Sequence, residues 1–150
     1  MEVAAALDQS ADVISMAEMW GRLSADTHNT VVVGSYGKST CTALLAHCLT
    51  HANKDPHYFV GAVPYNMPLS HAGSDDVFIM EGDEYPSSNF DMTSKFLYFT
   101  PENILITSGE HDHVNMFPTV TAYLKPYQEL LKKVSEKNLV VAGIENPNVP

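Results

Sequence analysis

A glycine-rich turn joins two segments of opposite character in the first third of this sequence. Before it lies a short β-branched run, residues 30–33, and after it a helical pattern that extends from residue 38 to about residue 53. The turn reads Gly34-Ser35-Tyr36-Gly37-Lys38-Ser39-Thr40. Glycines let the backbone turn tightly and bring N–H groups close to a ligand, and the N-terminus of a helix adds partial positive charge. Strand, glycine turn and helix in this order predict a phosphate-binding loop, with all seven residues in contact with ATP.

The side chains of this loop suit a triphosphate that carries a metal ion. Lys38 would reach the β- and γ-phosphates, and the hydroxyl of Ser39 would ligate Mg²⁺. The general pattern has a further glycine at position 32, where this sequence has Val32. An ordinary glycine turn with an exposed lysine is the alternative interpretation, and the order of strand, loop and helix favours the phosphate loop.

The rest of the chain alternates short apolar runs with loops and helical stretches. Residues 1–29 carry a helical pattern and are expected to form a lead-in helix rather than a domain. Further elements are expected as strands at 57–60, 77–80, 95–99, 104–107 and 139–141, a loop at 61–74 and a helix from 117 to about 133. Short apolar runs separated by helices predict an α/β fold with a mostly parallel sheet and helices on both faces. Active sites in such sheets lie outside the carboxyl ends of the strands.

The charge of the chain limits its partners. A formal net charge of -10, without any basic run, argues against a nucleic-acid-binding surface, because phosphates are neutralised by clustered Lys and Arg. No apolar stretch reaches the roughly 18 residues that cross a bilayer, and the N-terminus lacks the build of a signal peptide. We therefore expect a cytoplasmic protein with no membrane or nucleic-acid partner, in which positive potential is concentrated at the phosphate loop.

Acidic residues and histidines follow two predicted strands at the same edge of the sheet. Glu81 comes directly after the run 77–80, and a carboxylate there can hold Mg²⁺ directly or through water. Asp83 follows in an acidic turn that is either a second metal ligand or part of a solvated loop. The run Glu110-His111-Asp112-His113 follows residues 104–107. Its imidazoles and carboxylates would also admit zinc, although no cysteine lies near them.

Three motifs in the expected order resemble those of the Mur ligases, the ATP-dependent amino-acid and peptide ligases of peptidoglycan synthesis. Gly34 to Ser39 matches the family's short loop G-T-x-G-K-[ST], which also lacks the upstream glycine. Glu81 to Tyr85 matches E-A-D-E-[SY], and residues 108–113 match N-x-E-x-D-H in part. The resemblance extends from about residue 31 to residue 148. Residues 59–64 and 94–96 look most like the murein peptide ligase branch, and the L-alanine-adding branch is the next most similar.

The resemblance implies roles for individual residues and a reaction. Lys38 would bind the β- and γ-phosphates, Ser39 and Glu81 would hold one Mg²⁺, and His113 would help to hold a second. Lys38, Glu81 and His113 are thus the expected catalytic residues. The carboxylate of UDP-N-acetylmuramate would attack the γ-phosphoryl group of ATP to give an acyl phosphate, and the amine of an amino acid or peptide would then displace phosphate. The metal ions and Lys38 would neutralise charge on the transferred group.

Several positions depart from the family pattern. Ser35, Gly82 and Ser108 stand where the family has Thr, Ala and Asn, and Tyr36 replaces a common His or Asn. The amide lost at Ser108 leaves open a nucleotide-binding module that no longer catalyses. Folylpolyglutamate synthetase or another Mur relative is a further alternative, but it would not be expected to combine the Gly-x-Val-Pro segment with the motif of residues 81–85. A plain P-loop kinase or ATPase would normally carry an aspartate after the apolar strand.

The resemblance also predicts how the domains are organised. Residues 1–29 would be the tail of an N-terminal UDP-sugar domain, and residues 30–150 an ATP-binding central domain truncated at its C-terminal end. Pockets for the UDP-N-acetylmuramate-type substrate and for the amino acid or peptide would then be completed by domains outside this chain. The family's adenine contacts would also lie beyond residue 150, so we expect the chain alone to bind ATP weakly and to catalyse nothing.

Overall fold

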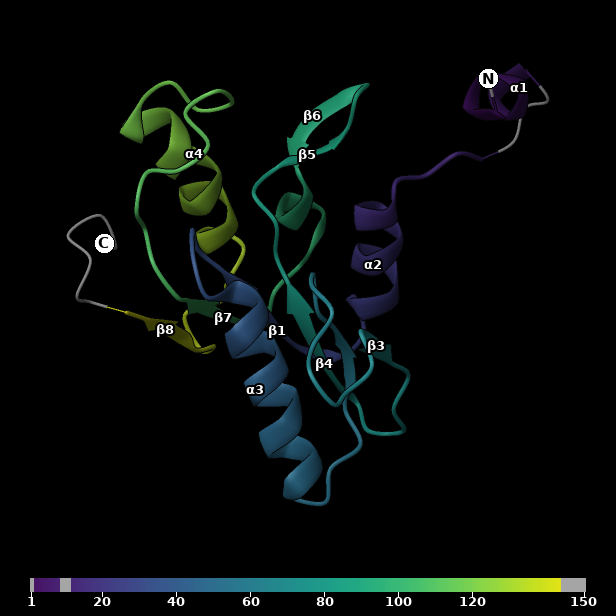
Figure 1. The fold of residues 1–150 in the computed structure, drawn as a ribbon, viewed down its shortest axis with the longest axis vertical. Helices are drawn as coiled ribbons and strands as arrows, with labels where there is room; N and C mark the ends of the chain where they lie inside the picture. Colours follow the sequence, from purple (N-terminus) through teal and green to yellow (C-terminus); the bar gives the residue numbers. More distant parts are fainter. Residues whose placement is uncertain (1, 9–11, 144–150) are drawn as a thin grey trace.

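A six-stranded sheet forms the centre of the computed structural model, which describes residues 2–8 and 12–143 (Figure 1). The strand order is β3-β2-β4-β1-β7-β8, and β3 alone is antiparallel to its neighbour. The strands are β1 His28–Val33, β2 His57–Phe59, β3 Ser70–His71, β4 Val77–Glu81, β7 Asn103–Ile106 and β8 Val140–Ala142. The predicted α/β fold with a mostly parallel sheet is confirmed.

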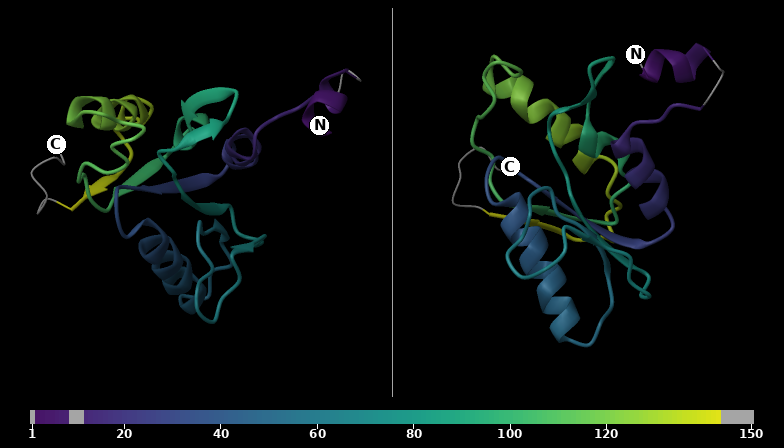
Figure 2. Two further views of the ribbon diagram at one scale, coloured as in Figure 1. Left: turned by 45° about the horizontal axis from the view of Figure 1, so that its top comes forward. Right: turned by 45° about the vertical axis from the view of Figure 1, so that its right-hand side comes forward.

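Helices cover both faces of this sheet. The helical elements are α1 Glu2–Asp8, α2 Met16–Ser24, α3 Lys38–His51, the 3₁₀ helix η1 Lys95–Tyr98 and α4 Val120–Leu131. Figure 2 shows α3 on one side of the sheet and α4 on the other. The single lead-in helix predicted over residues 1–29 is two helices, α1 and α2, and β1 already begins at His28. Residues 1 and 9–11 of that range lie outside the described residues.

The alternation of side chains along β1 explains why two cores form. Val31 and Val33 point into a cluster that α4 and η1 complete with Tyr123 and Phe96. Val32 points to the opposite face and packs in a second cluster with residues of α3. All three valines are at most 1% exposed. A continuous β-branched run is what a central strand buried on both faces requires.

The carboxyl ends of β1, β4 and β7 lie next to one another. The predicted site residues lie along this edge of the sheet. Val32 of β1 is in register with Glu81 of β4, and Val33 is in register with Ile106 of β7. Backbone hydrogen bonds continue past the strand ends, because Gly82 N donates to Val32 O at 2.8 Å and Thr107 N donates to Val33 O at 2.9 Å. The residues that follow β1, β4 and β7 therefore begin next to one another.

The predicted strand at residues 95–99 is wrong. These residues form η1, in which Phe99 N donates to Phe96 O. Both phenylalanines are buried, a spacing of three that suits one face of a turn and not the alternation of a strand. The amide of Phe96 bonds to Asp83 O outside the sheet. The preceding residues form a two-stranded hairpin that was not predicted, β5 Pro86–Ser88 and β6 Asp91–Ser94.

The remaining element boundaries differ from the predictions by a few residues. The last helix begins at Val120 and not at residue 117, because Thr119 caps it by accepting a hydrogen bond from Ala122 N at 3.1 Å. The predicted loop at 61–74 contains the short edge strand β3. In the described part of the chain, none of the helices has both the length and the apolar composition needed to cross a bilayer.

Helix α2 packs against η1 through a glycine. A Cβ atom at Gly21 would lie 2.3 Å from the backbone oxygen of Tyr98, so there is no room for a side chain. Ser15 caps this helix by accepting a hydrogen bond from Glu18 N at 3.0 Å. The close approach places Trp20 of α2 against Phe59, with ring centroids 4.9 Å apart. Residues of α2 thereby line a cavity at the carboxyl edge of the sheet.

We expect Gly21→Ala to lower the free energy of unfolding by about 1–2 kcal/mol, because overpacking against backbone outweighs the better helix propensity of alanine. Urea denaturation measures this change. Leu23→Ala on the exposed side of α2 is the control and should shift stability by less than about 0.5 kcal/mol. Equal stability of Gly21→Ala and the unchanged chain would contradict the packing of α2 on η1.

Candidate functional site

The phosphate loop has the backbone shape that its sequence predicts. Gly34 has φ +135°, and a Cβ atom there would lie 2.3 Å from Thr107 Oγ1. Gly37 has φ +82° and stands at the N-cap of α3, where no side chain accepts from the first helical amides. Both glycines occupy conformations that other residues rarely adopt. The first turn of α3 therefore presents unpaired N–H groups and the positive end of the helix dipole to a ligand.

The loop is braced by residues that follow β7. Tyr36 N donates to Ser108 Oγ at 3.0 Å, and Ser35 N donates to Ser108 O at 3.2 Å. Thr107 Oγ1 donates to Tyr36 O at 2.6 Å. Ser108, the position where the Mur motif has Asn, thus uses its hydroxyl and its carbonyl to hold the phosphate loop in place.

The side chain of Ser35 faces the core and not a ligand. It is 7% exposed, its Oγ lies 2.8 Å from the phenol oxygen of Tyr123, and it also donates to Glu110 O. Tyr123 in turn lies 2.9 Å from the phenol oxygen of Tyr127. Burial raises the pKa of both phenols, so they remain protonated donors in this chain of hydrogen bonds. The hydroxyl of Ser35 is thus engaged within the protein, and its amide is bonded to Ser108 O.

Lys38 lies at the centre of the site and is paired with a buried carboxylate. Its Nζ donates to Gly34 O at 2.7 Å and lies 3.0 Å from Glu84 Oε2. The Lys38 side chain is 14% exposed and that of Glu84 only 1%. A carboxylate so deeply buried requires a cation or several donors. Lys38 is one of its two partners.

His113 is the second partner of Glu84. Its Nε2 lies 3.0 Å from Glu84 Oε1, and its Nδ1 lies 2.9 Å from the phenol oxygen of Tyr85. The residue has φ 54°, a left-handed conformation, and its amide donates to Asp112 Oδ1 at 2.7 Å. Both ring nitrogens are therefore occupied, and His113 would have to release Glu84 or Tyr85 before it could ligate a metal.

Ser39 and Glu81 form the pair of oxygens that best fits Mg²⁺. Ser39 Oγ donates to Glu81 Oε1 at 2.9 Å, and Glu81 Oε2 accepts from Gly61 N at 2.6 Å. Two adjacent ligands of an octahedral Mg²⁺, each at about 2.1 Å, are about 3.0 Å apart. Among the described residues no group of three or more His, Cys, Asp and Glu gathers around one point. That suits Mg²⁺, which is commonly bound by one or two protein ligands with phosphates and water.

The same observations disfavour the zinc alternative. His111 Nε2 lies 2.7 Å from Phe117 O and is thus already engaged by a backbone carbonyl. Asp83, considered as a metal ligand, is instead paired with Lys95 and accepts from Tyr85 N at 3.1 Å. Lys38, Ser39, Glu81 and His113 remain the candidate residues for nucleotide and metal.

A cavity of about 370 Å³ is lined by three of these residues, Lys38, Glu81 and His113. Helix α2 and Phe59 form its apolar wall. Its charged and polar lining is Lys38, Glu81, Asp83, Glu84, Tyr85, Lys95 and His113. Charged groups on one side and an aromatic wall on the other are typical of a ligand site.

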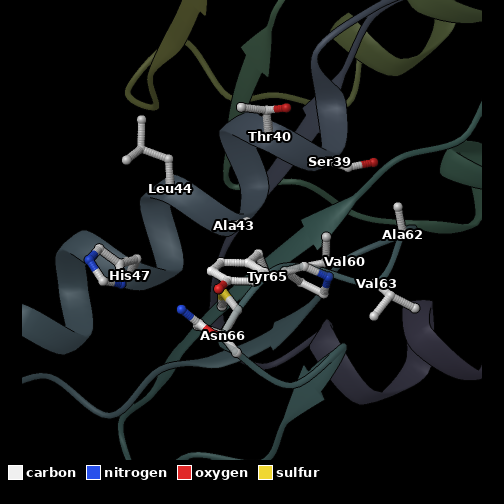
Figure 3. A pocket seen from close by; sticks show the side chains of 12 residues that line it. Ser39, Thr40, Ala43, Leu44, His47, Val60, Ala62, Val63, Tyr65 and Asn66 are labelled. Atoms are coloured by element: carbon white, nitrogen blue, oxygen red, sulfur yellow. The ribbon is translucent and has the colours of Figure 1, made fainter.

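A larger cavity of about 570 Å³ is lined by Ser39 (Figure 3). Residues of α3 and of the loop after β2 line it, including Thr40, His47 and Tyr65. Thr40 lines this cavity and is exposed. Tyr36 is 55% exposed. The charge of Asp112 raises the pKa of the Tyr36 phenol. The side chains of Tyr36 and Thr40 are thus exposed, and Tyr36 does not line this cavity.

Sequence reasoning missed Glu84. For the turn after β4, a metal-ligand role of Asp83 and a solvated loop were the two alternatives, yet Glu84 is 0% exposed and joins Lys38 to His113. The signal was present, because Glu84 and Tyr85 are the last two residues of the E-A-D-E-[SY] match. The role of Gly61 was missed as well, since its backbone N–H rather than a side chain contacts Glu81.

Comparison with known proteins shows a family match over most of the chain. The family model described as the Mur ligase middle domain matches residues 32–150. The UDP-N-acetylmuramate–L-alanyl-γ-D-glutamyl-meso-2,6-diaminoheptandioate ligase of Escherichia coli K12 is 31% identical over 111 residues, 73% of this chain and 24% of the relative. The UDP-N-acetylmuramate–L-alanine ligase of Rhodococcus erythropolis is 32% identical over 118 residues, 78% of this chain and 22% of the relative. The chain thus spans about a quarter of these relatives.

Solved structures show the same fold. The UDP-N-acetylmuramate:L-alanyl-γ-D-glutamyl-meso-diaminopimelate ligase from Neisseria meningitides superposes on this chain with a TM-score of 0.89 at 25% identity. The superposition covers 98% of this chain and 49% of that one. A murein peptide ligase from Psychrobacter arcticus superposes with a TM-score of 0.81 at 20% identity, over 98% of this chain and 34% of the other. Together with the family match and the phosphate loop, these likenesses show that the chain belongs to the Mur ligase family, as a middle domain.

Proposed function

We propose that this chain binds Mg²⁺–ATP, and that the full protein uses it to form an amide bond between a UDP-N-acetylmuramate-type substrate and an amino acid or peptide. One observation carries the proposal. Lys38, the Ser39–Glu81 oxygen pair and the free amides of α3 meet at the carboxyl edge of the sheet. This is the set of groups that a metal-bound triphosphate requires.

Each group has a distinct part in the proposed reaction. The amides of the first turn of α3 bind phosphate oxygens, and Lys38 donates to the β- and γ-phosphates. Ser39 and Glu81 would hold Mg²⁺, and the ion would supply positive charge to offset the negative charge of the γ-phosphoryl group. The substrate carboxylate attacks that group. An acyl phosphate forms and ADP leaves, after which the amine attacks the acyl carbon and phosphate departs. The residues of the chain mainly position and neutralise the reactants.

The names of the similar proteins support this class of reaction and suggest candidate substrates. Two relatives are about equally identical in sequence to this chain. The name of one gives L-alanine as the amine, and the name of the other gives an L-alanyl-γ-D-glutamyl peptide. Both kinds use UDP-N-acetylmuramate, so that part of the substrate is proposed here. The superposition on the peptide-adding ligase at a TM-score of 0.89 favours the peptide. A reaction that consumes ATP places the protein in the cytoplasm.

Replacing Lys38 tests the phosphate site. Lys38→Ala should reduce the affinity for a non-hydrolysable ATP analogue with Mg²⁺ by at least about 100-fold, because a charge-assisted contact is lost and Glu84 is left without its cation. Calorimetric titration measures the affinity. Lys54→Ala, which removes an exposed lysine beyond α3, is the control and should bind as the unchanged chain does. Undiminished binding by Lys38→Ala would exclude the phosphate-loop assignment.

Replacing His113 tests whether this residue contributes to metal binding. His113→Ala should weaken binding of the analogue in Mg²⁺ by about tenfold and leave binding in EDTA within about threefold. His51→Ala, which removes an exposed histidine at the end of α3, provides the comparison. If His113→Ala weakened binding equally in both conditions, the role of His113 would be structural.

A further inference from the structure

Glu84 differs from the other carboxylates of the site because it is fixed against the phosphate-binding lysine. Its two oxygens lie 3.4 and 3.0 Å from Lys38 Nζ. Burial and the contact to His113 hold it there, since the Glu84 side chain is only 1% exposed. His113 is itself fixed by Tyr85 and by its own backbone conformation. Glu84 therefore cannot move away from Lys38 by a simple side-chain rotation.

The charges that line the cavity do not favour a free triphosphate. Lys38 and Lys95 are its two ammonium groups, and Glu81, Asp83 and Glu84 are its three carboxylates. Lys95 is paired with Asp83, and Lys38 is paired with Glu84. The remaining carboxylate, Glu81, bonds to Ser39 and Gly61. Without a cation the cavity thus carries a net negative charge, which opposes a ligand of about four negative charges.

We propose that Glu84 determines specificity for the metal-complexed nucleotide over the free nucleotide, by neutralising Lys38. The inference rests on the proposed function, because it concerns the same nucleotide site. Lys38 still has an N–H to donate to a phosphate, but its charge is cancelled by Glu84. The attraction for the triphosphate then depends on the cation held at Ser39 and Glu81. Glu81 and Asp83 cannot have this effect, because neither contacts Lys38 at hydrogen-bond distance among the described interactions.

The variant Glu84→Gln separates this role from a structural one. Gln keeps the shape of the side chain and one acceptor oxygen but removes its charge. The analogue AMP-PNP is titrated calorimetrically in EDTA and in excess Mg²⁺. We expect Glu84→Gln to bind about tenfold more tightly in EDTA, because Lys38 regains its charge. Binding in Mg²⁺ should change by less than about threefold, because two effects oppose each other. The metal-complexed ligand carries about half the charge of the free ligand and gains less from the charge of Lys38. The contact of residue 84 that holds Lys38 in position is also weaker in the variant.

The control variant is Glu129→Gln, which removes one carboxylate from the exposed side of α4. It should leave both affinities unchanged and so exclude a general effect of net charge. If Glu84→Gln weakens binding equally in EDTA and in Mg²⁺, or does not tighten it in EDTA, then Glu84 is only a structural brace and the inference is overturned.

A second variant keeps the test decisive if Glu84→Gln does not fold. Lys38→Met with Glu84→Gln removes both charges of the pair, a change that buried pairs tolerate better than the loss of one partner. Its affinity in EDTA should lie within about threefold of the unchanged chain, because a neutralised Lys38 adds little there. A loss of tenfold or more would overturn the inference.

The unchanged chain distinguishes failure of the inference from failure of the proposed function. Equal affinity in EDTA and in Mg²⁺ would refute the role of Glu84 and leave the phosphate site intact. No saturable binding in either condition would refute the phosphate site and the role of Glu84 together.

Discussion

The buried carboxylate of Glu84 is the interaction on which the site depends. It joins Lys38 at the start of α3 to His113 beyond β7, while Glu84 itself follows β4. Three segments that are distant in sequence are thus held by one side chain that is 0% exposed. A carboxylate at this depth is stable only while its partners remain. The positions of the phosphate-binding lysine and of the histidine are therefore coupled.

Backbone pairing within the sheet brings these three segments close together. Parallel pairing of β1 with β4 and β7 brings the three strand ends to one edge, with Val32 beside Glu81 and Val33 beside Ile106. The alternating valines of β1 fix the register, because a shift by one residue would exchange the two cores. Apolar packing thus supplies the rigidity, and the loops that leave the edge supply the chemistry.

The sequence predicted the elements with strong local patterns and missed those set by tertiary contacts. The phosphate loop, the strands at its sides and Glu81 at the end of β4 follow from glycine placement and β-branched runs, and the structure brings Ser39 and Glu81 together. Residues 95–99 have strand-like composition but form η1, because Phe96 and Phe99 are buried on one side. Glu84 was matched to the family motif but given no role of its own, since local sequence does not show that Lys38, 46 residues earlier, pairs with it.

Nuclear magnetic resonance of the ¹⁵N-labelled chain, titrated with Mg²⁺ and AMP-PNP, tests the central claim most directly. The account predicts that the largest amide shifts occur at residues 34–40, at Gly61 and Glu81, and at Glu84 and His113, the groups that meet at the carboxyl edge of the sheet. Residues of β3 and the far end of α3 should not shift. Large shifts confined to other parts of the chain, with the phosphate loop unchanged, would contradict the account.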